Sequence, residues 1–353
     1  MNRFSWASPK SVAEAAELAS ATVADAMSGA GATDASGTSL VKAGGTDLLD
    51  LMKEGLVEPA RVVSLAALEE LKTIGQGPDG ALQLGSLLTL DRLGRDTDVG
   101  GRYPALARAA AASASPQIRN VATVGGNLLQ RPRCWYLRAA EYHCLRKGGG
   151  HCFALTGENQ YHAVFDNRPC AIVHPSTLAT VLVALGASVV LADPEGRQRR
   201  LALEDFFVSV EKDVQRENVL QRQEILLHVD VPPPAPGTRM AYARLSQKAA
   251  FDWPLVDAAV VLELATDGAC RAARIVLGSV APTPWRAREA ERVIVGRHVE
   301  ETPAAEAAGV AVKGATPLAG NAYKVTLART IVYRALLEAA ASAPSATQAQ
   351  RRG

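Results

Sequence analysis

The stretch VKAGGTDLL, residues 41–49, contains the first of two paired-glycine motifs in this chain. A β-type run leads into the paired glycines Gly44 and Gly45, and a helical pattern follows, so the stretch predicts a strand, a tight turn and a helix. Backbone N–H groups in such a turn can approach a phosphate at the helix N-terminus. Many paired-glycine turns bind nothing, and neither G-x-G-x-x-G nor G-x-x-x-x-G-K-[ST] occurs in a useful place.

A second pair, Gly125 and Gly126, lies in QIRNVATVGGNL, residues 117–128, among polar side chains that can donate hydrogen bonds. This stretch comes immediately before a cysteine-rich loop. Two glycine loops of this kind can clamp one dinucleotide between them.

Four of the five cysteines lie between residues 133 and 171, at Cys134, Cys144, Cys152 and Cys170. Thiolates select zinc or iron–sulfur clusters, so one inorganic centre is the simplest interpretation. The spacings of 9, 7 and 17 intervening residues include no C-x2-C pair, which disfavours a regular zinc module.

The cysteine segment is rich in glycine and poor in apolar periodicity, which is typical of a loop wrapped around a large cluster. We therefore favour a 4Fe-4S cluster, with zinc, two disulfides or free thiols as alternatives. Disulfides would need an oxidising compartment, and the first ten residues lack the features of a secretory signal. His143 and His151 flank the cysteines and can replace a ligand, although a lone histidine is more often a solvated loop residue.

The composition describes an ordinary globular protein. The 353 residues are 48% hydrophobic and 21% charged. The chain is long enough to form two or three hydrophobic cores. The formal net charge of +2 excludes an electrostatic footprint for nucleic acid or an acidic membrane. The longest apolar run, residues 177–192, falls short of the roughly 20 residues of a spanning helix and reads as a helix capped by Ser176 followed by a strand.

Helical and β-type patterns are mixed along the chain, which predicts an α+β or α/β domain. We expect helices at residues 11–27, with Ser11 as N-cap, and at 46–54, 104–114, 285–295 and 323–341. We expect strands at residues 40–43, 60–65, 82–90, 187–192, 224–231, 256–265 and 270–280. Asp267-Gly268 predicts a hairpin between the last two, because both turn positions favour positive φ. The proline-rich tract at 232–237 is the best candidate for a domain boundary, although such a tract can equally be a rigid surface turn inside a domain.

Four motifs together resemble the FAD-binding medium subunit of the xanthine dehydrogenase and CO dehydrogenase family, over almost the whole chain. They are AGGTDLL (43–49), QIRNVATVGGNLL (117–129), HPSTLATVLVALGA (174–187) and FDWPLVDAAV (251–260). The phrase LLQRPRCWY, which enters the cysteine segment, is similar to the subgroup with an additional 4Fe-4S cluster. That subgroup comprises the bacterial periplasmic aldehyde oxidoreductase type and, more distantly, 4-hydroxybenzoyl-CoA reductase.

The resemblance implies an α+β fold. A two-part FAD-binding domain of the PCMH or vanillyl-alcohol oxidase type is expected at residues 1–231, with an iron–sulfur insert at 131–171. A domain like the CO dehydrogenase flavoprotein C-terminal domain is expected at 238–341. Residues 342–353 are expected to be a disordered tail.

The resemblance also carries roles onto individual residues. The pyrophosphate of FAD is expected against Lys42, Ala43, Gly44, Gly45, Thr46, Asp47 and Leu48. The second FAD segment is expected to comprise Thr123, Gly125, Gly126, Asn127 and Leu129. Most members carry aspartate where this chain has Thr177, which changes the polar contact expected there. Trp253 falls where the family places a residue against the flavin ring, and Arg244 where it often places a basic one; each can instead be structural.

The implied function is that of an electron outlet with no catalytic residue of its own. In the family a molybdopterin-binding large subunit oxidises an aldehyde or heterocycle, a 2Fe-2S small subunit relays electrons, and FAD passes them to an external acceptor. A stand-alone FAD oxidase and a zinc-stapled assembly module are the alternatives. The compartment is expected to be the periplasm, reached by co-export with a signal-bearing partner, or the cytoplasm. Neither nucleic acid nor a membrane span is expected.

Overall fold

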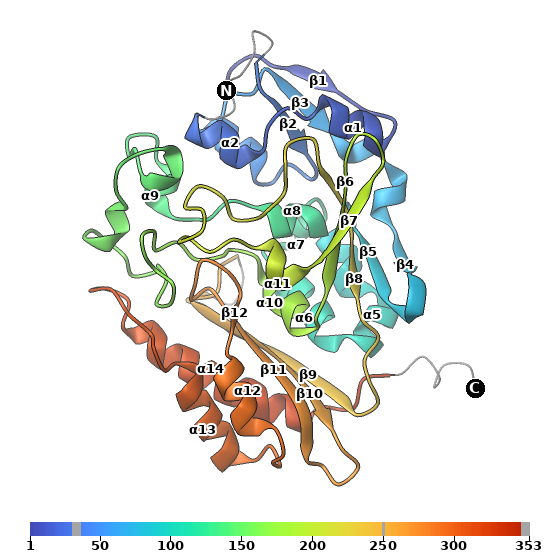
Figure 1. Ribbon diagram of the computed structural model, residues 1–353, viewed down its shortest axis with the longest axis vertical. Coiled ribbons are helices and arrows are strands. Elements are labelled where there is room, and N and C mark those ends of the chain that lie inside the picture. Colours follow the sequence, from blue (N-terminus) through green and yellow to red (C-terminus); the bar gives the residue numbers. More distant parts are fainter. Residues whose placement is uncertain (30–36, 249–250, 347–353) are drawn as a thin grey trace.

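Three sheets and the helices that cover them form the described part of the chain, residues 1–29, 37–248 and 251–346 of a computed structural model (Figure 1). A three-stranded N-terminal sheet lies at one end, a five-stranded sheet follows, and a four-stranded C-terminal sheet lies at the other end. The expected α+β class is confirmed.

The N-terminal sheet is parallel, in the order β1 (Ser5–Ala7), β3 (Arg61–Ser64) and β2 (Ser39–Lys42). It is accompanied by α1 (Val12–Leu18), α2 (Val23–Ser28) and α3 (Leu48–Lys53). Ser11 caps α1 as predicted. The single helix predicted for residues 11–27 is wrong, because Thr22 and Asp25 form a capping box that starts a second helix.

The five-stranded sheet is antiparallel, in the order β4 (Ile74–Gln76), β5 (Leu82–Gly85), β8 (Ile225–Val231), β6 (Ser188–Ala192) and β7 (Gln198–Ala202). The strand predicted for residues 82–90 ends early, because Thr89 caps the next helix with its side chain. Short 3-10 turns precede and follow β4 at η1 (Leu65–Ala67), η2 (Glu69–Lys72) and η3 (Pro78–Gly80).

A helical layer separates this sheet from the C-terminal sheet. It contains α4 (Leu90–Arg95), α5 (Thr97–Arg102), α6 (Pro104–Ala112), α7 (Pro116–Arg119), α10 (Thr177–Ala184) and α11 (Leu203–Phe206). Every residue of α10 is buried, because the helix packs on β10 and β11 while its leucines and valines join the core of the five-stranded sheet. Ser176 caps α10 by accepting the Ala179 N–H, so the apolar run is a capped helix and then a strand, as predicted.

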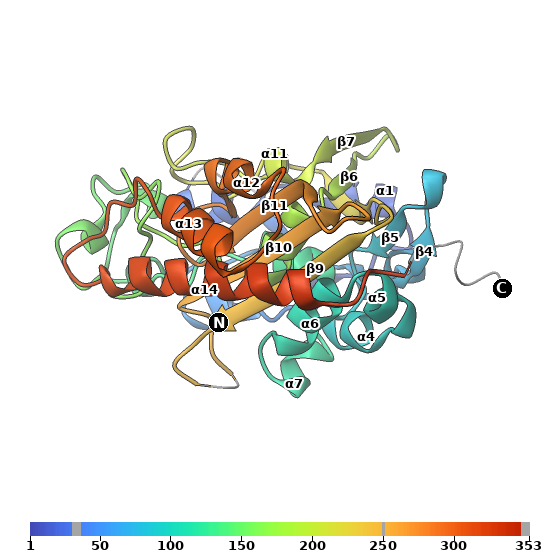
Figure 2. The same cartoon turned by 90° about the horizontal axis from the view of Figure 1, so that it is seen from below.

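The C-terminal sheet is antiparallel, in the order β12 (Trp285–Arg286), β11 (Cys270–Gly278), β10 (Val256–Leu264) and β9 (Thr238–Leu245). Helices α12 (Arg288–Ile294), α13 (Glu301–Ala311) and α14 (Tyr323–Ala341) cover its outer face (Figure 2). The hairpin is present, but only Gly268 in its turn has positive φ, at 88°, and the register shifts at Glu263 and Leu264. The helix predicted from residue 285 begins later, since Trp285 and Arg286 extend the sheet.

The cysteine insert, residues 131–171, contains α9 (Trp135–Arg138) and the 3-10 turns η4 (Leu145–Lys147) and η5 (Phe153–Leu155). The start of α14 and the residues just before it hold the last third of the insert in place. Asn321 donates to the carbonyls of His162 and Ala163 at 3.0 and 3.1 Å. The buried Lys324 ammonium donates to the carbonyls of Tyr161 and His162, both at 3.1 Å, and of Ser279 at 2.6 Å. Insert and C-terminal domain are therefore locked together through backbone groups.

The predicted disordered tail is wrong at its start. Ser345 is buried and its N–H donates to the Thr238 carbonyl at 2.8 Å, so β9 holds the chain beyond α14. The rest of that tail lies outside the described residues. No helix within the described ranges has both the length and the hydrophobicity needed to cross a membrane.

Candidate functional site

The two glycine loops meet in space. A Cβ on Gly44 would lie 2.1 Å from the Val121 carbonyl oxygen, and one on Gly125 would lie 2.9 Å from the Ser86 Cβ. These approaches are closer than any side chain permits, so glycine is required at both positions. The second loop leads into α8 (Val124–Leu129), which Thr123 caps by accepting the Gly126 N–H at 3.1 Å.

The first loop presents unused backbone donors. Within the described structure, the N–H groups of residues 44–47 donate to no protein acceptor. Consecutive free N–H groups form a concavity that attracts anions such as phosphate. This is the property that a pyrophosphate cradle requires.

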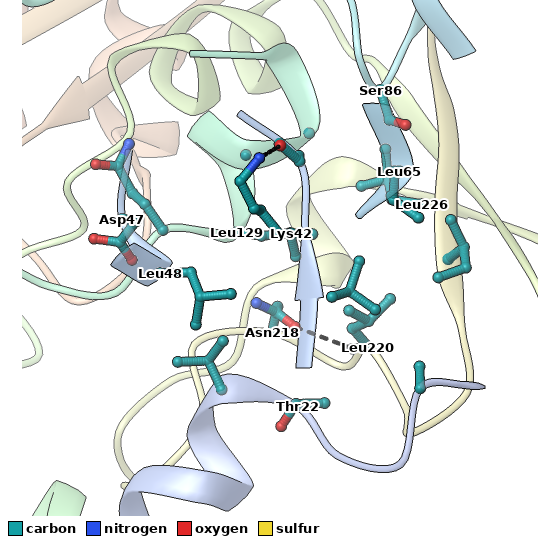
Figure 3. A pocket seen from close by; sticks show the side chains of 18 of the residues that line it. Thr22, Lys42, Asp47, Leu48, Leu65, Ser86, Leu129, Asn218, Leu220 and Leu226 are labelled. Carbon is teal, nitrogen blue, oxygen red and sulfur yellow. Dashed lines mark hydrogen bonds between the residues drawn. The ribbon is translucent and has the colours of Figure 1, made fainter. Parts of the chain in front are cut away.

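The loops open onto a first cavity, which encloses about 1180 Å³ including solvent at its mouth. Lys42, Leu48 and Leu129 lie around it, together with Asn218 and Leu220 from the opposite wall (Figure 3). The Lys42 ammonium donates to the Ala43 carbonyl at 3.1 Å, and burial lowers its pKa. The cavity is large enough for part of a dinucleotide.

A second cavity of about 1050 Å³ adjoins the first and shares four lining residues with it: Thr46, Asp47, Gly126 and Gln130. Every residue expected to contact FAD lines one of the two cavities. The first is lined by Lys42, Ala43, Gly44, Gly45, Thr46, Asp47, Leu48, Thr123, Gly125, Gly126 and Leu129. Asn127, Thr177, Arg244 and Trp253 line only the second. Their roles toward the cofactor stay predictions.

Several of these residues also make structural contacts. Asn127 accepts the Ser176 hydroxyl at 2.7 Å and so ties α8 to α10. The Arg244 guanidinium donates to the Ala112 carbonyl and, at 3.0 Å, to the Asp252 carbonyl. Trp253 is half exposed, with the Arg133 guanidinium 5.0 Å from its ring centroid. An aromatic ring at the rim of the second cavity suits a planar heterocycle.

Asp47 fixes the first loop to the start of the cysteine insert. Its carboxylate accepts the Arg131 N–H at 2.8 Å and forms ion pairs with Arg133 at 2.9 Å and Arg138 at 2.6 Å. It makes no capping bond to α3. The loop that would hold the cofactor is therefore braced by the cysteine insert.

The four clustered cysteines come together, while Cys270 lies apart in the core of the C-terminal domain. Cys134 packs with Cys152 and Cys170 and lies close enough to Cys144 and Cys170 for their charges to interact. Burial raises the pKa of Cys134 to about 12. A hydrogen bond from Cys170 lowers the pKa of Cys152. All five thiols are free, so the disulfide alternative has no pair here.

The thiols gather without forming a site for a single metal ion. Among the residues that the structure describes, no three His, Cys, Asp or Glu side chains are arranged to hold one ion. His162 Nε2 lies 3.2 Å from the Cys134 sulfur, whereas no hydrogen bond joins His143 or His151 to a cysteine sulfur in the described residues. A set of four thiols, partly buried and drawn from one segment, has the donor chemistry of an iron–sulfur centre.

His174 makes the folding stability of the chain depend on pH. Burial, together with the nearby Arg146 charge, lowers its pKa to about 3. Its Nδ1 accepts the Ser176 N–H at 3.3 Å, which requires the neutral ring. As the pH falls, the unfolded chain takes up this proton near pH 6.5, whereas the folded chain takes it up only near pH 3. The stability that His174 contributes is therefore complete above pH 6.5 and is lost as the pH falls toward 3.

Below pH 5.5, we expect His174→Asn to reduce the slope of the free energy of unfolding against pH by about 1.4 kcal/mol per pH unit. Urea unfolding of both proteins between pH 7 and 4.5 measures the two slopes. Equal slopes in the variant and the unmodified chain would show that His174 does not titrate on unfolding.

The opposite wall of the first cavity was not predicted from the sequence. It comes from Arg216, Glu217, Asn218, Leu220, Gln221, Gln223, Glu224, Ile225 and Leu226. This polar stretch reads as a solvated loop, and nothing in its spacing indicates that Glu217 is buried. Arg131, also in the wall, lies within the LLQRPRCWY phrase but was not singled out.

Comparisons with known proteins agree with this geometry. The family described as FAD binding domain in molybdopterin dehydrogenase matches residues 2–234, and the CO dehydrogenase flavoprotein C-terminal domain matches residues 241–339. The aldehyde oxidoreductase FAD-binding subunit of Escherichia coli K12 is 34% identical over 305 residues, covering 85% of this chain and 91% of that subunit. The carbon monoxide dehydrogenase medium chain of Hydrogenophaga pseudoflava is 29% identical over 338 residues, covering 95% and 96%.

Solved structures show the same fold. Carbon monoxide dehydrogenase from Hydrogenophaga pseudoflava matches with a TM-score of 0.71 and 27% identity, covering 96% of this chain and 97% of that one. Quinoline 2-oxidoreductase from Pseudomonas putida 86 matches with a TM-score of 0.70 and 26% identity, with the same coverage of 96% and 97%. The expected combination of an FAD-binding domain with a CO dehydrogenase-like C-terminal domain is confirmed. The chain belongs to the family of FAD-binding medium subunits of the xanthine and CO dehydrogenases, which are oxidoreductases.

Proposed function

We propose that this chain is the FAD- and 4Fe-4S-containing electron-transfer subunit of a heterotrimeric molybdenum hydroxylase that oxidises aldehydes. Its partners would be a 2Fe-2S small subunit and a molybdopterin-binding large subunit. The observation that carries the proposal is the meeting of two glycine loops beside four gathered thiols, in a chain similar to an aldehyde oxidoreductase subunit.

Residues of the two cavities would bind different parts of FAD. The free N–H groups of residues 44–47 would bind the pyrophosphate, and the Lys42 ammonium would add a positive charge. Thr177, Arg244 and Trp253 would orient the ring in the second cavity. When bound, FAD supplies reversible two-electron chemistry, while the protein provides position and hydrogen bonds.

Cys134, Cys144, Cys152 and Cys170 would be the ligands of the 4Fe-4S cluster. Thiolate is the form that binds, and their partial burial keeps solvent away from such a centre. The insert is anchored both to the first glycine loop through Asp47 and to the C-terminal domain through Asn321 and Lys324. Both anchors would fix the thiols at a constant distance from the flavin.

The test is anaerobic purification of the chain with whatever partners accompany it, followed by analysis of FAD, iron and molybdenum. We expect one FAD and about four irons per chain, with a molybdenum subunit in the complex. Flavin without iron would overturn the cluster, and zinc without flavin would overturn the whole proposal. Turnover of a substrate with oxygen by the chain alone would support a stand-alone oxidase instead.

A further inference from the structure

Two buried arginines and one glutamate form a continuous ionic chain. Arg131, Arg146 and Glu217 are exposed by only 1%, 1% and 4%. One carboxylate oxygen of Glu217 accepts a hydrogen bond from Arg131 and the other accepts one from Arg146. Arg131 also donates to the Gln215 carbonyl at 2.9 Å. We call this set the arginine chain.

The arginine chain has one end at each cofactor region. Arg131 and Glu217 line the first cavity, where the two glycine loops meet. Arg146 lies at the cysteines, within reach of Cys170 and near Cys144. An arginine side chain stays protonated in proteins, so the buried Arg146 guanidinium places a positive charge next to the thiols.

The charge of the arginine chain does not balance, since two guanidinium groups share one carboxylate. Within the described residues, Nε and Nη2 of both arginines are buried and have no hydrogen-bond partner. Nε2 of the neighbouring His174 is also buried without a hydrogen-bond partner in this part of the structure. Buried donors without acceptors are costly, and they are rare in folded proteins. Three of these donors, from Arg146 and His174, lie at the cysteine end of the arginine chain and call for an anionic group there.

A thiolate-bound iron–sulfur cluster held by the four cysteines would supply that negative charge at the Arg146 end. Its reduction, by electrons from substrate oxidation or from an added reductant, would add one electron and one negative charge and break no bond. A nearby buried cation stabilises the more negative state, because charges interact more strongly in the interior than in water. Charge, hydrogen bonds and burial are the means by which a protein tunes such a centre.

We propose that the arginine chain sets the reduction potential of the iron–sulfur cluster, with Arg146 raising it and Glu217 lowering it. Arg146 acts as a positioning and charge-supplying residue rather than a ligand. This inference rests on the proposed function, because it requires the cluster. Since Glu217 also lines the first cavity, the same carboxylate lies between the cluster region and the flavin region.

The test is an anaerobic redox titration of the complete complex, followed by EPR of the reduced cluster. We expect Arg146→Gln to shift the redox equilibrium toward the oxidised cluster by at least tenfold. For a one-electron couple this lowers the reduction potential by about 59 mV. We expect Glu217→Gln to shift it in the opposite direction by a similar factor. The exposed Arg95, paired with Asp91 on α4, provides the control Arg95→Gln, which should leave the potential unchanged.

The outcomes separate the two proposals. Absence of iron from the unmodified complex would overturn the proposed function. Iron at full occupancy with the same potential in all variants would overturn the inference and leave that function intact. If Arg146→Gln loses iron, Glu217→Gln decides, because it keeps the shape of the side chain; an unshifted or lowered potential in that variant would overturn the inference.

Discussion

Replacing Gly44 by alanine should abolish FAD loading and destabilise the chain by about 3 kcal/mol or more. The new methyl group would lie 2.1 Å from the Val121 carbonyl oxygen and 2.9 Å from its carbon. Both atoms belong to the backbone of the second glycine loop, so no rotamer change relieves the overlap. The two loops must move apart, which spoils the cradle formed by the N–H groups of residues 44–47. Flavin absorbance per chain and the urea unfolding midpoint measure the two effects.

The matched control is Gly100→Ala. Gly100 lies in α5 (Thr97–Arg102), and a Cβ there would meet no atom within 4 Å. We expect full FAD content and an unfolding free energy that is unchanged or higher by about 0.5–1 kcal/mol, the usual gain of alanine over glycine in a helix. If Gly44→Ala retained a full complement of FAD, the proposed position of the pyrophosphate would be wrong.

Replacing Cys144 by serine should remove the iron–sulfur signal while most of the FAD stays bound. The hydroxyl is a poor substitute for a thiolate ligand of iron. Cys144 packs under the N-terminal sheet with Leu40, Leu48 and Leu51, and it does not line either cavity. Iron analysis, the visible spectrum and EPR after reduction report the cluster, and extracted FAD reports the flavin.

The fifth cysteine separates the loss of a ligand from the loss of a buried thiol. Cys270 is exposed by only 1%, and its thiol donates to the Ala272 carbonyl at 3.2 Å within the C-terminal domain. Cys270→Ser should therefore keep both iron and FAD. Unaltered iron in Cys144→Ser, or equal loss in both variants, would contradict the assignment of the four clustered cysteines as ligands.

Local signals in the sequence were sufficient for most of the fold. Ser176 and the apolar run after it gave a capped helix and a strand, since each depends on neighbours along the chain. Residues 11–27 were misread because alanine and valine continue at helical spacing through the break, while the capping box at Thr22 is a polar signal inside that pattern. The parallel N-terminal sheet and its partners depend on non-local pairing, which periodicity does not report.

The candidate site likewise has parts that the sequence predicted and parts that it did not. Paired glycines mark the two loops, because the close approach of backbones excludes any other residue at Gly44 and Gly125. The wall around Glu217 had no comparable signal, since charged residues are normally solvated and their burial results from tertiary packing. The arginine chain therefore became visible only in three dimensions.

The lock between α14 and the cysteine insert sets an order of maturation. Asn321 and Lys324 follow the insert by about 150 residues, yet they donate to the carbonyls of residues 161–163, which lie beside Cys170. A ribosome releases these two side chains long after the cysteines have emerged. Until then the insert lacks its C-terminal support. Completion of the chain is thus the event that fixes the last third of the insert.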